Sequence, residues 1–312
     1  MYMKTVLITG GTGLVGRALV RHFVASGLSV IVCSRNPGRQ TPQSFVRYAY
    51  WDPAKGILDE TAISEADYIV NLAGAGVVDH KWTDAYRETI RASRVQSGRL
   101  IVETLKNKPH HVKAVVNASA IGWYGPDRTG RQTPFREEDP SSNDFLGETC
   151  RAWEASIDLV GASGIRLIKL RFGIVLAQEG GALAEFIRPL RFGLAAVIGN
   201  GKQVMSWIGR EDLCRMISFA LLESEISGVY NAVSPHPVTN KELNRTLAGL
   251  MRGRFYLKMH VPAFVIRLML GSRSVEVLKS TTVSAEKIRS AGFVFRYPEL
   301  EKALSAELSL KS

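Results

Sequence analysis

The pattern over residues 4–35 constrains the fold of this chain more than any other feature. An apolar, strand-like run at residues 4–9 leads into a glycine-rich turn, a helical pattern and a second apolar run at residues 29–34. Elements in this order form a βαβ unit, and the glycines of its first turn let backbone amides approach a pyrophosphate at the helix N-terminus. We therefore predict a dinucleotide site at this turn. Its expected contacts are Gly10, Thr12, Gly13, Leu14, Val15 and Gly16.

The residues that end the second run bear on which dinucleotide is bound. An acidic residue there would accept a hydrogen bond from the ribose 2′-hydroxyl of NAD. The chain has Ser34 and Arg35 instead, a hydroxyl beside a fixed cation, and this pair suits the 2′-phosphate of NADP. We therefore expect NADP as the cofactor; the alternative explanation of Arg35 is a solvated surface arginine.

Strands and helices continue to alternate through the first half of the chain. Apolar runs at residues 68–73, 112–119 and 165–172 are separated by helical patterns at about residues 83–106 and 145–162. Alternation with short connections favours parallel pairing. The sequence therefore predicts an α/β fold built on a Rossmann-type, doubly wound parallel sheet.

The alternation loosens after residue 175, where glycines and prolines punctuate shorter elements. We expect an NADP-binding domain over residues 1–175, with its sheet completed by parts of residues 176–235. A smaller substrate lobe with a C-terminal extension would then span residues 176–312.

Charge and composition limit the partners of the chain. It carries 40 Lys and Arg against 29 Asp and Glu, a net charge of +11. The cations lack the interleaved aromatics and the helix-turn-helix or finger spacing of nucleic-acid-binding proteins, so we expect no nucleic-acid partner. Their field favours anionic small molecules instead. No run approaches the roughly 20 apolar residues of a membrane span, so we also expect no membrane partner. The six histidines show no metal-ligand spacing.

Three scattered cysteines show no pairing pattern, which suits a reduced cytoplasmic protein. The first strand begins close to Met1 and leaves no room for a signal peptide, so we expect a cytoplasmic location. Nothing in the sequence indicates the oligomeric state.

Several further motifs accompany the glycine-rich turn. They are Asn71-Leu72-Ala73-Gly74-Ala75, Arg91-Ala92-Ser93-Arg94-Val95, Ser119-Ala120-Ile121-Gly122-Trp123-Tyr124-Gly125, Trp153-Glu154-Ala155, Leu170-Arg171-Phe172-Gly173-Ile174-Val175-Leu176 and Ala291-Gly292-Phe293. With them, nearly the whole chain resembles the extended short-chain dehydrogenase/reductase superfamily. More narrowly it resembles the atypical, epimerase-like branch with a C-terminal extension. This resemblance implies a Rossmann-type nucleotide domain followed by a C-terminal substrate domain.

The resemblance also assigns residues to the cofactor. It places Leu72 and Ala73, with Gly74 after them, on the adenosine and pyrophosphate side. It places Ser119 and Phe172, with Ile174 beyond, near the nicotinamide. Arg94 would clamp a cofactor phosphate or an anionic substrate, and an ion pair within the fold is the alternative.

The catalytic pair of the superfamily is missing. That chemistry needs a tyrosine and a lysine four residues later, because this spacing puts both on one helical face, where the ammonium lowers the phenol pKa. Here the helix reads Phe145-Leu146-Gly147-Glu148-Thr149-Cys150. Whether Phe145 or Leu146 takes the place of the tyrosine, the partner is Thr149 or Cys150, and neither register supplies the pair. The usual catalytic hydroxyl falls on Ala120, with Ser119 just before it.

Three side chains are candidates for the missing chemistry. Tyr124 follows a strand and is the best remaining phenol, although packing in the wall is the alternative. Ser119 could hydrogen-bond a carbonyl or the nicotinamide amide. Glu148 offers a carboxylate on the helix, although we expect it to face solvent.

The leading hypothesis is an NADP(H)-binding oxidoreductase-like protein that transfers a hydride at a carbonyl or alcohol carbon of an unidentified small substrate, for which an anion is one candidate. Water, Tyr124 or the substrate itself would handle the proton. Two alternatives stay open: a nucleotide-sugar epimerase or dehydratase, and a non-catalytic NADP-sensing or scaffold protein.

Overall fold

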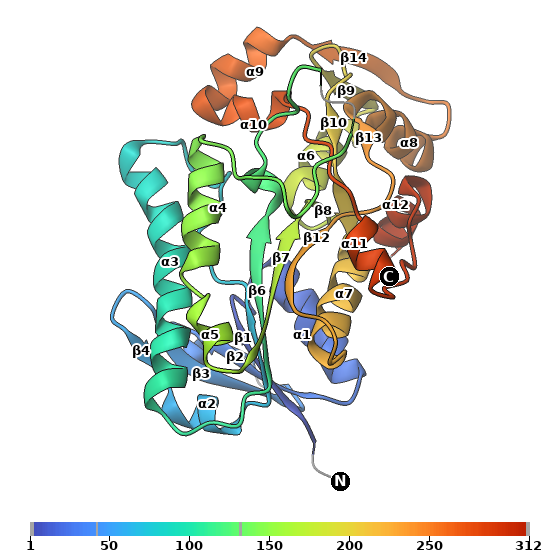
Figure 1. Cartoon of the computed structure of the whole chain (residues 1–312). Coiled ribbons are helices and arrows are strands. Elements are labelled where there is room, and N and C mark those ends of the chain that lie inside the picture. Colours follow the sequence, from blue (N-terminus) through green and yellow to red (C-terminus); the bar gives the residue numbers. More distant parts are fainter. Residues whose placement is uncertain (1–2, 42, 131–132, 310–312) are drawn as a thin grey trace.

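The computed structural model describes residues 3–41, 43–130 and 133–309, and its centre is an eight-stranded sheet (Figure 1). In spatial order the strands are β12 (Gly228–Ala232), β7 (Arg166–Phe172), β6 (Ala114–Ala120), β5 (Tyr68–Asn71), β1 (Thr5–Thr9), β2 (Ser29–Ser34), β3 (Val46–Asp52) and β4 (Ile57–Leu58). Every neighbouring pair is parallel except β3 and β4. The predicted Rossmann-type, doubly wound α/β fold is confirmed.

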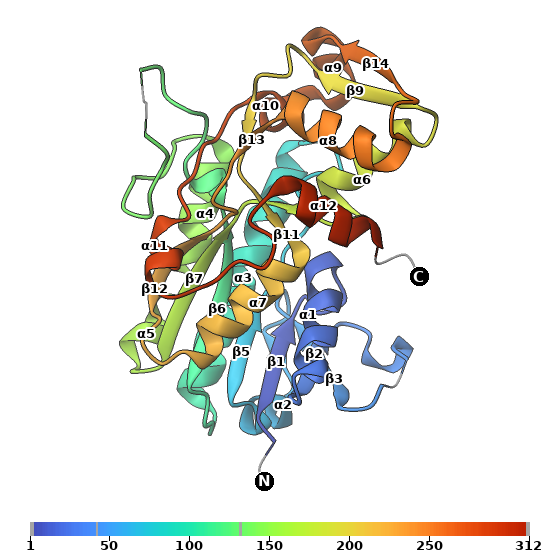
Figure 2. The same cartoon turned by 90° about the vertical axis from the view of Figure 1, so that its right-hand side faces the viewer.

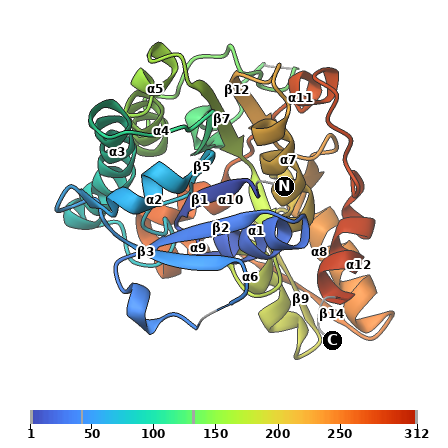
Figure 3. The same ribbon diagram turned by 90° about the horizontal axis from the view of Figure 1, so that it is seen from below.

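The apolar runs form strands because both faces of the sheet are buried. In β1, Val6 and Ile8 pack in the cluster on one face and Leu7 packs in the cluster on the other. Figure 3 shows the two helical layers on either side of the sheet. On one side lie α1 (Leu14–Ala25) and α7 (Arg210–Leu222); on the other lie α2 (Glu60–Glu65), α3 (Asp84–Asn107), α4 (Phe145–Ala155) and α5 (Leu159–Ala162).

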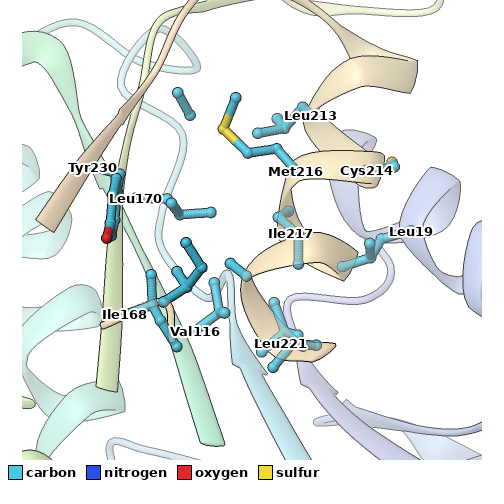
Figure 4. Close-up of a cluster of buried hydrophobic side chains, with 14 of the residues drawn as sticks. Leu19, Val116, Ile168, Leu170, Leu213, Cys214, Met216, Ile217, Leu221 and Tyr230 are labelled. Carbon is cyan, nitrogen blue, oxygen red and sulfur yellow. The ribbon is translucent and has the colours of Figure 1, made fainter. Parts of the chain in front are cut away.

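Figure 4 shows how the sheet and α7 share one core. Leu213, Met216 and Ile217 of α7 point toward Ile168 and Leu170 of β7, and all five are buried. This packing ties the second half of the chain to the nucleotide-binding sheet.

The remaining elements form the upper lobe of Figure 1 and reach back toward the sheet. They are β8 (Ile174–Leu176), α6 (Gly181–Leu190), β9 (Leu194–Ile198), β10 (Val204–Met205), β11 (Trp207–Gly209), β13 (Val238–Thr239), α8 (Asn240–Arg252), β14 (Leu257–Val261), α9 (Ala263–Leu270), α10 (Ser274–Leu278), α11 (Glu286–Ser290) and α12 (Leu300–Ser309). Short 3-10 turns lie at Pro37–Arg39, Ile121–Trp123 and Gly271–Arg273. Figure 2 shows the C-terminal segment passing α11 beside β12 before it ends in α12.

Two details refine the expectations from the sequence. The helix expected over residues 145–162 is interrupted at residues 156–158, between α4 and α5. The edge strand β12 comes from the second half of the chain, as expected for a sheet completed by residues 176–235. The division of the chain near residue 176 stays a prediction. Within the described ranges, none of the helices is both long and apolar enough to cross a bilayer.

Candidate functional site

The glycine-rich turn is built so that only glycine fits at its two ends. Gly10 has φ +67°, and a Cβ there would lie 2.8 Å from the carbonyl carbon of Leu72. A Cβ on Gly16 would collide with the carbonyl oxygen of Gly10. The first turn of α1 is thereby held tight against β1 and the loop after β5. Such a bare backbone surface lets a pyrophosphate approach closely, as a dinucleotide site requires.

The N-terminus of α1 presents free backbone donors beside this surface. Gly13 is the N-cap and supplies no side-chain cap. Thr12 and Gly13 are exposed, and Leu14 and Val15 are half-buried. The first amides of a helix lack partners within the helix and carry a partial positive charge, so they suit a phosphate group.

Ser34 and Arg35 lie next to the turn. Thr9 pairs with Cys33 in the parallel register of β1 and β2, so the residues after them, Gly10 and Ser34, are neighbours. Ser34 is half-buried and its Oγ accepts a hydrogen bond from the Asn36 amide at 3.1 Å. Arg35 is exposed, and no carboxylate of the described residues pairs with it. A cation and a hydroxyl therefore border the turn.

A buried polar network fixes the loop that holds Leu72, Ala73 and Gly74. Thr9 Oγ1 accepts from the amides of Leu72 and Ala73, each at 3.2 Å, and donates to Asn71 Oδ1 at 2.6 Å. Asn71 Nδ2 in turn donates to Asn117 at 2.7 Å. This network was not predicted from the sequence, although polar residues inside apolar strands were the available signal.

A cavity of about 190 Å³ opens beyond the ends of β6 and β7. Its lining is mostly apolar and comes from both halves of the chain. The lining residues are Val77, Ile90, Arg94, Ala120, Ile121, Gly122, Leu146, Thr149, Cys150, Trp153, Phe172, Gly173, Ile174 and Glu276. The predicted Arg94, Phe172 and Ile174 are therefore brought together here.

The cavity favours one of the two registers of the missing catalytic pair. Leu146 and Cys150 both line it, four residues apart on α4, whereas of the other register only Thr149 lines it. Phe145 instead packs edge-on against Trp82, with ring centroids 5.0 Å apart. Leu146 and Cys150 therefore stand where a tyrosine and a lysine would be needed. Burial raises the pKa of the Cys150 thiol to about 12, so this group is a poor acid near neutral pH. Glu148 is exposed, as expected.

Tyr124 and Ser119 do not line the cavity. Each is 1% exposed. The Tyr124 hydroxyl donates to Asn231 Oδ1 at 2.7 Å and accepts from Arg171 Nη1 at 2.9 Å. Ser119 Oγ donates to Glu154 Oε1 at 2.7 Å. Both hydroxyls thus belong to a buried network around Arg171, and the catalytic roles of Tyr124 and Ser119 stay predictions. Burial also raises the pKa of the Tyr124 phenol, which opposes its ionisation.

Glu276 is the carboxyl group in the lining, and it was not predicted from the sequence. It belongs to α10 of the upper lobe, and its Oε1 lies 2.7 Å from Nζ of Lys279. Their side chains are 24% and 10% exposed. Burial raises the pKa of Glu276, and the ammonium of Lys279 only partly offsets this. A carboxyl group in such surroundings can hold a proton at a higher pH than usual.

Comparisons with known proteins agree with this geometry. The model of the NAD dependent epimerase/dehydratase family matches residues 6–232, and that of a domain of unknown function, DUF1731, matches residues 261–307. The epimerase family protein YfhF of Bacillus subtilis is 34% identical over 301 residues, 96% of each chain. A crystal structure of the human epimerase family protein SDR39U1 with NADPH matches with a TM-score of 0.85 and 29% identity. It covers 98% of this chain and 99% of the human one.

A second solved structure, described as a nucleoside-diphosphate sugar epimerase from Corynebacterium glutamicum, matches with a TM-score of 0.76 and 29% identity. The match covers 99% of this chain and 59% of that one.

Proposed function

Since the chain belongs to the NAD-dependent epimerase/dehydratase family, we propose that it is an NADP(H)-dependent oxidoreductase that acts on a carbonyl or alcohol carbon of a small substrate. The observation that carries this proposal is the order of four loops along one edge of the sheet. The neighbouring strands β1, β5, β6 and β7 lead into the glycine turn, the loop of Leu72 to Gly74 and two segments that line the cavity. Carboxyl ends of parallel strands share one edge, where such sheets bind their ligands.

These loops suggest which residues hold which part of the cofactor. The glycine turn, with Leu72 to Gly74, would hold the pyrophosphate and adenosine. Phe172 and Ile174 would border the nicotinamide end, because they line the cavity. The buried Ser119 would act only through Glu154, to which it is hydrogen-bonded.

The preference for NADP rests on Arg35 and Ser34. A guanidinium and a hydroxyl at the end of β2 suit a 2′-phosphate, and no acidic residue takes their place. The similarity to a human relative whose structure contains NADPH supports the same preference.

When bound, NADP(H) would supply or accept a hydride at the cavity. The protein must then move a proton at the substrate oxygen, and neither Leu146 nor Cys150 can do so. We assign this role to Glu276: in the direction of reduction its carboxylic acid gives its proton to the carbonyl oxygen. Lys279 then stabilises the carboxylate that remains, and solvent returns the proton.

Turnover of a panel of small aldehydes, ketones and quinones with NADPH tests this function, followed by absorbance. We expect reduction of at least one member, with deuterium carried from C4-labelled NADPH into the alcohol. Glu276→Gln should lower kcat by about 10²- to 10⁴-fold, the usual range for general acid catalysis. Glu301→Gln, exposed on α12, is the matched control and should change little. Tight NADPH binding with no turnover of any compound would instead favour a non-catalytic NADP-sensing protein.

The cavity measures about 190 Å³, below the roughly 300–1,000 Å³ usual for drug-sized ligands, which supports a small substrate. The epimerase alternative is also compatible with the family. We also propose a cytoplasmic location, since Cys33, Cys150 and Cys214 are all free and buried.

A further inference from the structure

Arg94 brings a positive charge into a mostly apolar cavity. It lies in the middle of α3, is half-buried and lines the cavity with Trp153 and Phe172. Its guanidinium carbon lies 5.0 Å from the centre of the Trp153 ring. It also packs against Gly74, where a Cβ would lie 3.0 Å from the same carbon. The guanidinium is therefore held firmly in place.

The hydrogen bonds of this guanidinium leave most of its donors available. Nη1 donates to the carbonyl oxygens of Ala75 at 3.0 Å and Ile90 at 2.9 Å. Among the described residues, no hydrogen bond engages Nη2 or Nε, and no carboxylate pairs with Arg94. Burial lowers the pKa of Arg94, although a guanidinium stays charged in a protein. Its charge is desolvated and has no anion beside it.

The two fully buried arginines, and one that is half-buried like Arg94, have charged or dipolar partners. Arg171 pairs with Glu154, and Arg210 pairs with Glu179 and Glu307. Arg166 donates to carbonyl oxygens at the end of α7, where the helix dipole is negative. Burying an unpaired charge is costly, so an uncompensated guanidinium facing a cavity indicates a ligand anion.

We propose that Arg94 binds the anionic group of the substrate, so that the substrate is a small oxo acid, or the matching hydroxy acid, with an apolar body. This inference rests on the proposed function. The planar guanidinium suits a carboxylate, which can accept two parallel hydrogen bonds. The apolar body would contact Val77, Ile90, Leu146 and Trp153, which line the same cavity.

Glu276 and Arg94 are the acidic and the basic residue in the lining of the cavity. Both line it, yet they form no ion pair with each other. Arg94 would bind the acid group of the substrate, while Glu276 exchanges a proton with the carbonyl or alcohol oxygen. This arrangement favours substrates that carry an acid group and, near it, a distinct carbonyl or alcohol group.

Binding of a matched pair of compounds tests the inference. Phenylglyoxylate and its neutral methyl ester are titrated calorimetrically into the protein saturated with NADP+. The wild type should bind the acid at least about 10-fold more tightly than the ester, and Arg94→Gln should weaken acid binding about 10- to 100-fold. Arg94→Lys keeps the positive charge but loses the two parallel donors of the guanidinium. Its affinity for the acid should therefore lie between those of the wild type and Arg94→Gln. Arg91→Gln, on the same helix in an exposed pair with Glu88, should change nothing.

NADPH affinity, measured on the same variants, separates the explanations. Arg94→Gln should bind NADPH as the wild type does and keep its circular dichroism spectrum. A large loss of NADPH affinity with an unchanged preference for the acid would make Arg94 a cofactor clamp and overturn the inference. Equal binding of acid and ester by a wild type that binds NADPH would also overturn it. A wild type that binds no NADPH would instead contradict the proposed function.

Discussion

Arg171 and Glu154 form a buried ion pair, with Nε 2.8 Å from Oε1 and Nη2 3.1 Å from Oε2. Arg171 directly precedes the cavity-lining Phe172, and Glu154 directly follows the cavity-lining Trp153. The guanidinium also lies 3.8 Å from the centre of the Trp123 ring. The pair thus ties β7 to α4 next to the cavity.

Removing one member of this pair should destabilise the fold strongly. Arg171→Leu leaves the buried Glu154 with only the more distant ammonium of Lys169, 4.0 Å away, and breaking a buried ion pair costs about 3–5 kcal/mol. The free energy of unfolding in urea measures the loss. Arg188→Leu, which breaks the exposed pair with Glu185, is the control and should cost less than about 1 kcal/mol. A loss for Arg171→Leu no larger than that of the control would contradict the structural role of the pair.

Tyr124→Phe should affect stability and leave chemistry unchanged. The substitution removes the donor to Asn231 Oδ1 and an acceptor of Arg171, so we expect a loss of about 1–3 kcal/mol. With any carbonyl compound that the protein reduces, kcat should stay within about twofold of the wild type. A fall of about 10²-fold or more, as for loss of a general acid, would return Tyr124 to a catalytic role.

Gly16→Ala should damage the cofactor site. The added methyl group would collide with the carbonyl of Gly10, so the turn must move away from the place where we expect the pyrophosphate. We expect NADPH affinity to fall at least about 10-fold. Gly249→Ala, within α8, is the control, because nothing lies within 4 Å of its added Cβ and alanine favours a helix by roughly 0.5–1 kcal/mol. Unchanged NADPH binding by Gly16→Ala would show that the turn does not hold the cofactor.

The fold and the glycine turn could be predicted because their signals are local. Apolar runs mark buried strands, and Gly10 and Gly16 are required by the tight turn between β1 and α1. Arg94 could also be identified, because it belongs to one of the motifs that carry the family resemblance, Arg91-Ala92-Ser93-Arg94-Val95.

The chemistry of the cavity could not be predicted in the same way. Tyr124 follows a strand, as a catalytic residue would, but its hydroxyl turns toward Asn231 on β12, far along the chain. Glu276 reaches the cavity only because α10 of the upper lobe folds over α4. Such contacts depend on tertiary packing, which leaves no local mark on the sequence.

Glu276 should make stability depend on pH. Its pKa in the folded chain is raised above the ordinary 4.5, with burial opposed by Lys279 and assisted by Asp144. As the pH rises from 4.5 to that raised value, the folded state holds more protons than the unfolded chain, so the contribution of Glu276 to stability falls. The stability of the wild type relative to Glu276→Gln should therefore decline over this window and then level off. Urea unfolding at several pH values measures the difference, and parallel curves for the two proteins would contradict the raised pKa.

Calorimetric titration of NADPH and NADH into the wild type and Arg35→Glu tests the central claim most directly, with Arg99→Glu, exposed on α3, as control. We expect the wild type and the control to bind NADPH about 10- to 100-fold more tightly than NADH, and Arg35→Glu to lose this preference. Tighter binding of NADH by the wild type, or no binding of either nucleotide at about 1 mM, would contradict it.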